Sequence, residues 1–233
     1  MNNRVFIHNA IYINLQDIVK NDAASVIDGI SQLCIVGLDE LLSDPPGLER
    51  NVPIFFGSAF SSLKSLHEFD AVSQSSGALA VNPSLFPNTV LNAPSCRAGI
   101  HFGITQPIYN ISNGVYAGLN ALEYAYLHIV NGEYESAIVC AVEEFSDIAL
   151  KSGKKAGTNC CGAIYLSARH SLIELLNLGN MAADNVAEKH VMEECTDIIQ
   201  LIHEFTRGCE LYNRIAVENY GNYDAVIEMA RCG

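Results

Sequence analysis

Six consecutive apolar residues at positions 137–142 constrain the fold of this chain more than any other feature of its sequence. A strand with one face in water alternates apolar and polar residues, so an unbroken run of this length is typical of a strand buried on both faces. Such a strand lies in a sheet that helices cover on both sides. The segment before it repeats apolar residues at helical spacing, at Leu119, Leu122, Tyr126 and Ile129. Together the two patterns predict an α/β fold.

Shorter runs divide the chain into two parts. Strands are expected at residues 5–7, 53–56, 108–111 and 163–166, and helices at 61–69, 91–104 and 147–151. Serine, glycine and proline residues predict an exposed loop with a defined conformation over residues 72–88. After residue 167 we expect helices only, from a stripe at Val191, Cys195, Ile198, Ile202 and Phe205 and from pieces at 211–215 and 223–229. This pattern predicts an α/β domain over residues 1–167 and a helical extension over residues 168–233.

The composition argues against several classes of function. The formal net charge is −13, so nucleic acid and anionic membranes are poor partners. The eight cysteines are scattered without metal-ligand spacing, which predicts reduced thiols in a cytoplasmic protein and no metal site. No signal peptide or membrane-spanning stretch is expected. Hydrophobic residues make up 49% and charged residues only 17%, which suits either an ordinary apolar α/β domain or a chain buried against a partner.

The segment from Ile108 to Leu122 carries the chemical information. Its β-branched and aromatic start predicts a strand, the Ser112, Asn113 and Gly114 residues predict a sharp turn, and the apolar repeat predicts a helix. A turn of this kind lifts one residue onto the N-terminus of a helix, where backbone N–H groups favour negative charge. Enzymes use such an elbow to lower the pKa of a thiol and so to present a thiolate nucleophile.

This segment resembles the nucleophile elbow of β-ketoacyl synthases, which reads roughly Ser-Thr-Ala-Cys-x-x-Gly-x-x-Ala-Ile. In an ungapped match Ser112 takes the place of the serine, Gly118 that of the glycine, and Ala121 and Leu122 that of Ala-Ile. Residues 83–93 look like the segment that precedes the dimer-interface helix of that family, and residues 137–144 look like its buried strand ending in an acidic pair. The resemblance covers about residues 50–167 and implies a thiolase-like fold, of which one half is recognisable.

Two departures separate the chain from an active ketosynthase. The nucleophilic cysteine falls on Val115, which can neither attack a thioester nor accept a proton. The family also needs two histidines as bases, and the later His170, His190 and His203 stand in none of the expected contexts. We interpret them as surface or partly buried histidines. No catalytic residue, cofactor or metal is therefore expected.

The resemblance implies a partner. Ketosynthases pair through the strand before the elbow, so Ile108, Tyr109 and Ile111 would meet the same strand of an active ketosynthase subunit. Type II polyketide systems contain such a pair, in which a chain-length factor lacks the cysteine and shapes the acyl tunnel. The remaining tunnel or interface candidates, which could equally be core residues, are Asn113, Gly114, Val115, Tyr116, Cys96, Ile100 and Phe102. An acidic acyl carrier protein would dock mainly on the partner, since like charge opposes docking here.

Three functions stay open on the sequence alone. The first is a chain-length-factor-like subunit of a β-ketoacyl synthase complex, an acyltransferase that elongates polyketide or fatty-acid-like chains. The second is a thioester decarboxylase or hydrolase that uses another residue, such as Cys96 or Cys160. The third is an acyl-binding pseudoenzyme that acts alone.

Overall fold

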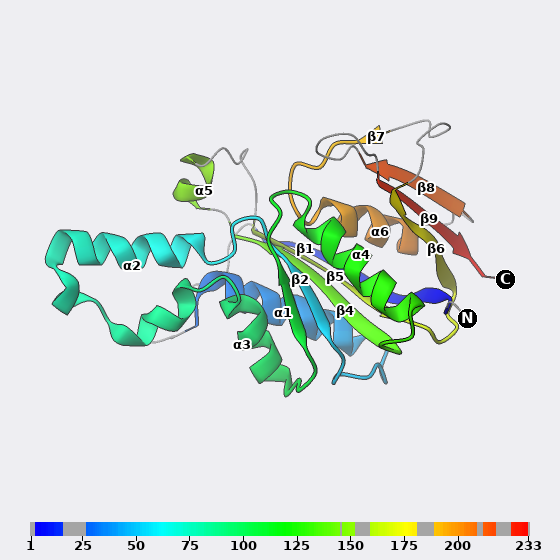
Figure 1. Ribbon diagram of the computed structural model, residues 1–233, viewed down its shortest axis with the longest axis horizontal. Helices are drawn as coiled ribbons and strands as arrows, with labels where there is room; N and C mark the ends of the chain where they lie inside the picture. The colour runs from blue at the N-terminus through cyan, green and yellow to red at the C-terminus, as the bar shows by residue number, and fades with distance from the viewer. Residues whose placement is uncertain are drawn as a thin grey trace.

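The fold is built on one mixed sheet of nine strands in the order β3-β2-β4-β5-β1-β6-β9-β8-β7 (Figure 1). The computed structural model describes residues 3–15, 27–144, 146–151, 159–180, 189–208, 212–217 and 225–232. The strands are β1 (Val5–Leu15), β2 (Ile54–Gly57), β3 (Ile108–Ile111), β4 (Ser136–Glu143), β5 (Asn159–Ser167), β6 (Ile173–Asn180), β7 (Lys189–His190), β8 (Tyr212–Val217) and β9 (Ala225–Arg231).

Helices cover both faces of this sheet. One face packs against α4 and α6, and the opposite face packs against α1 and α3. The helices are α1 (Gly29–Ser43), α2 (Leu63–Ser76), α3 (Ala93–Phe102), α4 (Ala117–Val130), α5 (Asp147–Lys151) and α6 (Asp197–Arg207), with the 3-10 helices η1 (Ala78–Ala80) and η2 (Pro83–Thr89). The α/β class expected from the sequence is confirmed.

Strand β4 is the doubly buried strand that the apolar run predicted. All eight of its residues are buried. It pairs in parallel with β2 and antiparallel with β5. Its alternate side chains enter the two cores, with Val139 on the α4 side and Ile138 on the α1 side.

Strand β5 is packed closely by helices on both faces. A Cβ atom at Gly37 of α1 would lie 2.2 Å from the Cys161 Sγ atom, and one at Gly162 would lie 2.8 Å from the Cβ atom of Ile199 on α6. Glycine at these positions therefore sets how near each helix comes to the sheet. The distances are shorter than real side-chain contacts allow, so larger residues would push the helices outward.

The expectation of a purely helical segment over residues 168–233 is wrong. Among the described residues of that segment only α6 is helical, while β6, β7, β8 and β9 add four strands to the same sheet. The predicted helices at 211–215 and 223–229 fall largely on β8 and β9. Short apolar runs do not distinguish a strand from a helix. Here these segments form strands because they pair with strands that are distant in the sequence. The first strand, expected at 5–7, extends to Leu15, and its Val5–Ile7 end pairs with β6.

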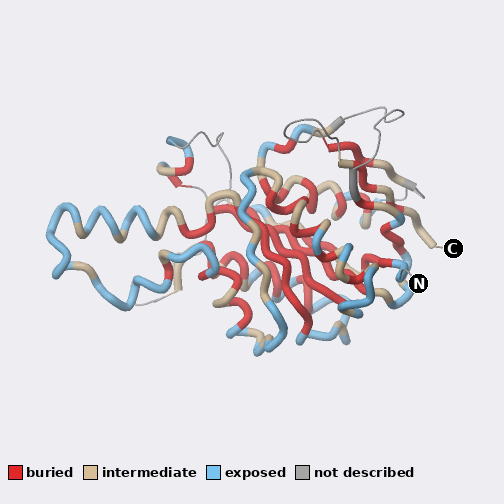
Figure 2. The backbone as a smooth tube through the Cα atoms, viewed as in Figure 1, coloured by how far each residue is buried: buried red, intermediate tan, exposed pale blue. Residues whose placement is uncertain are grey.

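The predicted loop over residues 72–88 is also more regular than expected. Helix α2 continues to Ser76, and η1 and η2 follow it. These three helices project away from the sheet and are largely exposed (Figure 2). Among the described residues no helix is both long and apolar enough to cross a lipid bilayer.

A Gly162→Val substitution should lower the free energy of unfolding by about 1–3 kcal/mol, because the branched side chain would collide with Ile199. Denaturant unfolding measures the change. Adding Ile199→Ala removes the side chain with which the valine collides. The double variant should therefore lose less free energy of unfolding than the two single variants lose together. Strictly additive effects would contradict the close contact.

Candidate functional site

The strand–turn–helix elbow predicted from the sequence is present between β3 and α4. The five residues 112–116 make the turn, with Gly114 at a φ of 55°. This left-handed conformation favours glycine. The turn is closed by two backbone hydrogen bonds, from Tyr116 N–H to the Asn113 oxygen at 3.2 Å and from Ala117 N–H to the Gly114 oxygen at 3.1 Å.

Two close backbone approaches hold the first turn of α4 in place. A Cβ atom at Gly118 would lie 1.9 Å from the carbonyl oxygen of Cys195, which precedes α6. A Cβ atom at Gly57, the last residue of β2, would lie 2.5 Å from the Ala117 oxygen. Gly118, the glycine that matches the ketosynthase motif, is therefore required by packing in this chain. It lets the backbone at Cys195 close over the start of α4.

Val115, which the sequence resemblance sets at the nucleophile position, lies two residues before α4 begins. Its side chain and that of Tyr116 are half-buried and pack against the core on the α4 side of the sheet. The N-terminus of a helix is a favourable place for a thiolate or an oxyanion. Valine provides neither, so this elbow offers shape without a reactive atom.

The other predicted residues fall on two faces of the sheet. Tyr109 and Ile111 pack on the α4 side, whereas Ile108 and Phe102 pack on the α3 side. On α3, Cys96 is half-buried and Ile100 is 79% exposed. The ten candidates therefore form an elbow group (Tyr109, Ile111, Asn113, Gly114, Val115, Tyr116) and an α3 group (Cys96, Ile100, Phe102, Ile108).

These two groups meet at β3, which is an edge strand. It pairs with β2 on one side and with no other strand among the described residues. A groove of about 460 Å³ adjoins the elbow on the α4 side, lined by Ile111, Asn113, Asn120, Glu123, Tyr124 and Leu127. The Asn113 amide donates to the Asn120 oxygen at 2.7 Å across this groove.

An aromatic cluster that was not predicted from the sequence packs against β3 on the α4 side of the sheet. The Tyr109 ring stacks on Phe55 with centroids 4.6 Å apart, and its hydroxyl lies 2.7 Å from the Tyr134 hydroxyl. This hydrogen bond raises the pKa of Tyr134 to about 12. His128 packs against the same rings and contacts Glu133 at 2.7 Å. The members come from four separate segments, so no local pattern revealed the cluster.

The acidic pair at the end of β4, Glu143 and Glu144, is buried. Glu143 accepts hydrogen bonds from the Ala59 N–H group and, at 3.4 Å, from the Ser58 hydroxyl. Glu144 forms an ion pair of 2.7 Å with Lys64 of α2. Burial raises the pKa of Glu144 and Lys64 opposes that shift. Through these interactions both carboxylates connect the end of β4 to the segment between β2 and the start of α2.

The described cysteines lie outside the turn of the elbow at residues 112–116. Seven are described, all are free thiols, and five are buried. Cys195 lies beside the elbow, but burial and the charge of Glu143 raise the pKa of its thiol well above the usual value. Cys160 is buried between Glu194 and Thr196, with its Sγ atom 3.0 Å and 3.2 Å from their oxygens. In the described part of the chain no group of three or more potential ligands could hold a metal ion.

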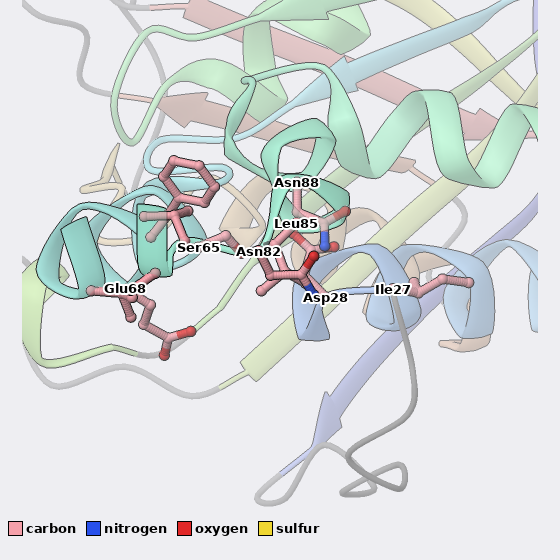
Figure 3. Close-up of a pocket in the computed structure, with 11 residues that line it drawn as sticks. Ile27, Asp28, Ser65, Glu68, Asn82, Leu85 and Asn88 are labelled. Atoms are coloured by element: carbon pink, nitrogen blue, oxygen red, sulfur yellow. Dashed lines mark hydrogen bonds between the residues drawn. The ribbon is translucent and has the colours of Figure 1, made fainter. Parts of the chain in front are cut away.

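The histidines outside the expected contexts are also placed away from the elbow. His170 packs against Phe6 with ring centroids 5.0 Å apart. On α6, burial lowers the pKa of His203. A separate cavity of about 350 Å³ lies between the start of α1 and α2–η2, and no elbow residue lines it (Figure 3).

Solved structures show which fold this is, although no protein-family model and no curated protein matches the sequence. A β-ketoacyl synthase from Burkholderia phymatum superposes with a TM-score of 0.75 at 10% identity, over 99% of this chain and 100% of that chain. The ishigamide ketosynthase/chain length factor matches with a TM-score of 0.73 at 15% identity, over 95% and 86%. A chain of the ketosynthase ApeO complex with its chain length factor ApeC, from Xenorhabdus doucetiae, matches with a TM-score of 0.69 at 13% identity, over 98% and 99%.

The chain thus has the thiolase-like fold of ketosynthases and of ketosynthase–chain-length-factor complexes, at low sequence identity. The superpositions extend beyond residues 50–167, the part that resembles the family in sequence. They include the segment after residue 167, where the strands were not expected.

A Gly118→Ala substitution should destabilise the protein by about 3 kcal/mol, because the added methyl group would overlap the Cys195 carbonyl oxygen. Denaturant unfolding checks this. The control is Leu127→Ala on the exposed face of the same helix, which should change the stability by no more than about 0.5 kcal/mol. Equal effects of the two substitutions would contradict the close approach.

Proposed function

We propose that this chain is a non-catalytic, chain-length-factor-like subunit that pairs with an active ketosynthase. The observation that carries the proposal is Val115 at the tip of an intact elbow. The turn, the helix start and the close packing at Gly118 are all retained, while the residue that would carry out the chemistry is aliphatic. The role of such a site is to present a shape to a partner rather than to form a covalent bond.

The thiols around the site support a role without chemistry. A buried thiol whose pKa is raised is protonated at neutral pH and is a poor nucleophile. Cys195, the cysteine whose backbone packs against α4, is of this kind. Among the solved structures with the same fold are complexes of a ketosynthase with its chain length factor, so a ketosynthase partner is in keeping with the fold.

The edge position of β3 supports pairing through this strand. Its outer side has backbone N–H and C=O groups that a partner strand can satisfy, which would continue the sheet across the two subunits. The elbow group and the α3 group lie on either side of that edge, so both would face a partner. We infer that Tyr116 and Val115 border the acyl tunnel on one side of the sheet, and Cys96, Ile100 and Phe102 contribute on the other.

The net charge of the chain is consistent with a pair in which the other subunit binds the acyl carrier protein. With a net charge of −13, it would repel an acidic acyl carrier protein. The carrier protein would then dock mainly on the ketosynthase, which holds the growing chain. No cofactor is required for this role.

Co-expression with candidate ketosynthases from the source genome tests the function. We expect a 1:1 complex in size-exclusion chromatography and an elongated product when an acyl carrier protein and malonyl thioester are supplied. Omitting this chain should abolish the product or make the ketosynthase insoluble. An undiminished yield of product from a soluble ketosynthase without this chain would contradict the proposal.

A Tyr116→Ala substitution should alter the length of the product without abolishing condensation, because it removes a half-buried ring beside the elbow. Mass spectrometry of the products measures this. Tyr126→Ala, which removes a half-buried ring from α4 outside the groove beside the elbow, is the matched control and should leave the product length unchanged. An unchanged length distribution for Tyr116→Ala would count against its role in the tunnel.

A further inference from the structure

A cavity of about 410 Å³ lies where β1 and β6 separate. In the described part of the chain these two strands pair over residues 5–7 of β1, and the pairing ends at Ile173 of β6. The walls of the cavity come from β1, from the start of β6, from the end of β9 and from the ends of α1 and α6. No elbow residue lines it, and β2, β4 and β5 lie between β1 and the β3 edge. The cavity is therefore separate from the surface proposed for the partner.

The floor of the cavity is the outer edge of β1. The pairing of β1 with β5 shifts register between Ile7 and Asn9, which leaves His8 as an extra residue, and both Ile7 and Ala10 enter the core on the α4 side. Beyond Ile7 the outer backbone groups of β1 pair with no other strand among the described residues. Backbone groups on such an edge can form hydrogen bonds with an extended ligand.

The last carbonyl groups of the two helices at the cavity already have partners. The Asn9 amide donates to the Leu41 backbone oxygen of α1 at 2.8 Å. At the end of α6, Arg231 donates to the backbone oxygens of Phe205 and Thr206, at 2.9 and 3.1 Å. Asn9 and Arg231 therefore satisfy the helix ends, and the other charged side chains of the cavity are not needed for this purpose.

Charged side chains of opposite sign line the cavity from two helices. Glu40 and Asp44 stand at the end of α1, and both are exposed. His203 and the exposed Arg207 belong to the last turn of α6. Burial and the charge of Arg207 lower the pKa of His203, so its imidazole is uncharged at neutral pH. No ion pair within the described ranges joins Arg207 to either carboxylate, so these three charges remain available to a ligand.

This arrangement suits a zwitterion better than a simple ion. An anion attracted by Arg207 would be repelled by Glu40 and Asp44, and a cation attracted by the carboxylates would be repelled by Arg207. A molecule with an ammonium group at one end and a carboxylate at the other satisfies both sides. Amino acids and short peptides carry these two groups. A small apolar side chain would find buried apolar residues of β1 at the floor, since a few polar groups around an apolar base are typical of ligand pockets.

We propose that this cavity binds a zwitterion of the amino-acid class with an apolar side chain, either as the free amino acid or as a short peptide. Its ammonium group lies beside Glu40 and Asp44, its carboxylate beside Arg207, and its side chain against Ile7 and Ala10. The proposal does not rest on the function or the partner proposed above.

The first test measures the binding of leucine and of the dipeptide alanyl-leucine to the full chain by isothermal titration calorimetry. At least one of them should bind a saturable site with a Kd of about 1 mM or below. Acetylating the amino group or amidating the carboxyl group of that probe should raise the Kd about tenfold, because each change removes a hydrogen bond between charged groups. Tighter binding of leucine assigns the cavity to a free amino acid, and tighter binding of alanyl-leucine assigns it to a peptide.

The second test places the site on the chain. Glu40→Gln and Arg207→Gln should each raise the Kd of the bound probe about tenfold, and neither should unfold the protein because both side chains are exposed. The control is Asp39→Asn, an exposed carboxylate next to Glu40 that does not line the cavity, and it should leave the Kd unchanged. Circular dichroism checks that each variant is folded.

Three results would overturn the proposal. The first is the absence of saturable binding of either probe to the folded wild-type chain. The second is an equal affinity for the acetylated or the amidated probe, because recognition would then not use both charges. The third is a Kd that Asp39→Asn raises as much as Glu40→Gln does, because the probe would then bind elsewhere. None of these results bears on the pairing with a ketosynthase.

Discussion

The complete burial of β4 is the constraint on which the rest of the structure depends. A strand buried on both faces needs hydrogen-bonded neighbours and a helical layer on each side. Strands β2 and β5 supply the neighbours, α4 and α6 form one layer, and α1 and α3 form the other. The start of α4 is in turn fixed where its backbone meets Gly57 and Cys195, so the position of the elbow follows from the packing of the central sheet.

The elbow between β3 and α4 is held by backbone geometry and close packing. The turn at Gly114 and the close approach at Gly118 place residue 115 just before a helix N-terminus. The close approach at Gly118 is to the carbonyl oxygen of Cys195, so it does not involve the side chain of residue 115. Val115 is half-buried and follows β3, which pairs with no strand other than β2 in the part of the chain that the structure describes.

Local patterns predicted the centre of the fold well, because each element there is decided by its own residues. The apolar run at 137–142 and the repeat from Leu119 to Ile129 identify β4 and α4 without reference to the rest of the chain. The strands after residue 167 depend on the free edge of β1, which lies more than 150 residues earlier in the sequence. The aromatic cluster around Tyr109 and the buried state of Glu143 likewise depend on segments far apart in sequence, so their environment could not be predicted locally.

The central claim is that this chain holds no acyl nucleophile and that the partner does. Intact-mass spectrometry of the mixed subunits, taken after incubation with an acyl carrier protein loaded with an acyl thioester, measures this directly. The account predicts an acyl adduct on the ketosynthase and none on this chain. A stoichiometric acyl adduct on this chain would contradict it.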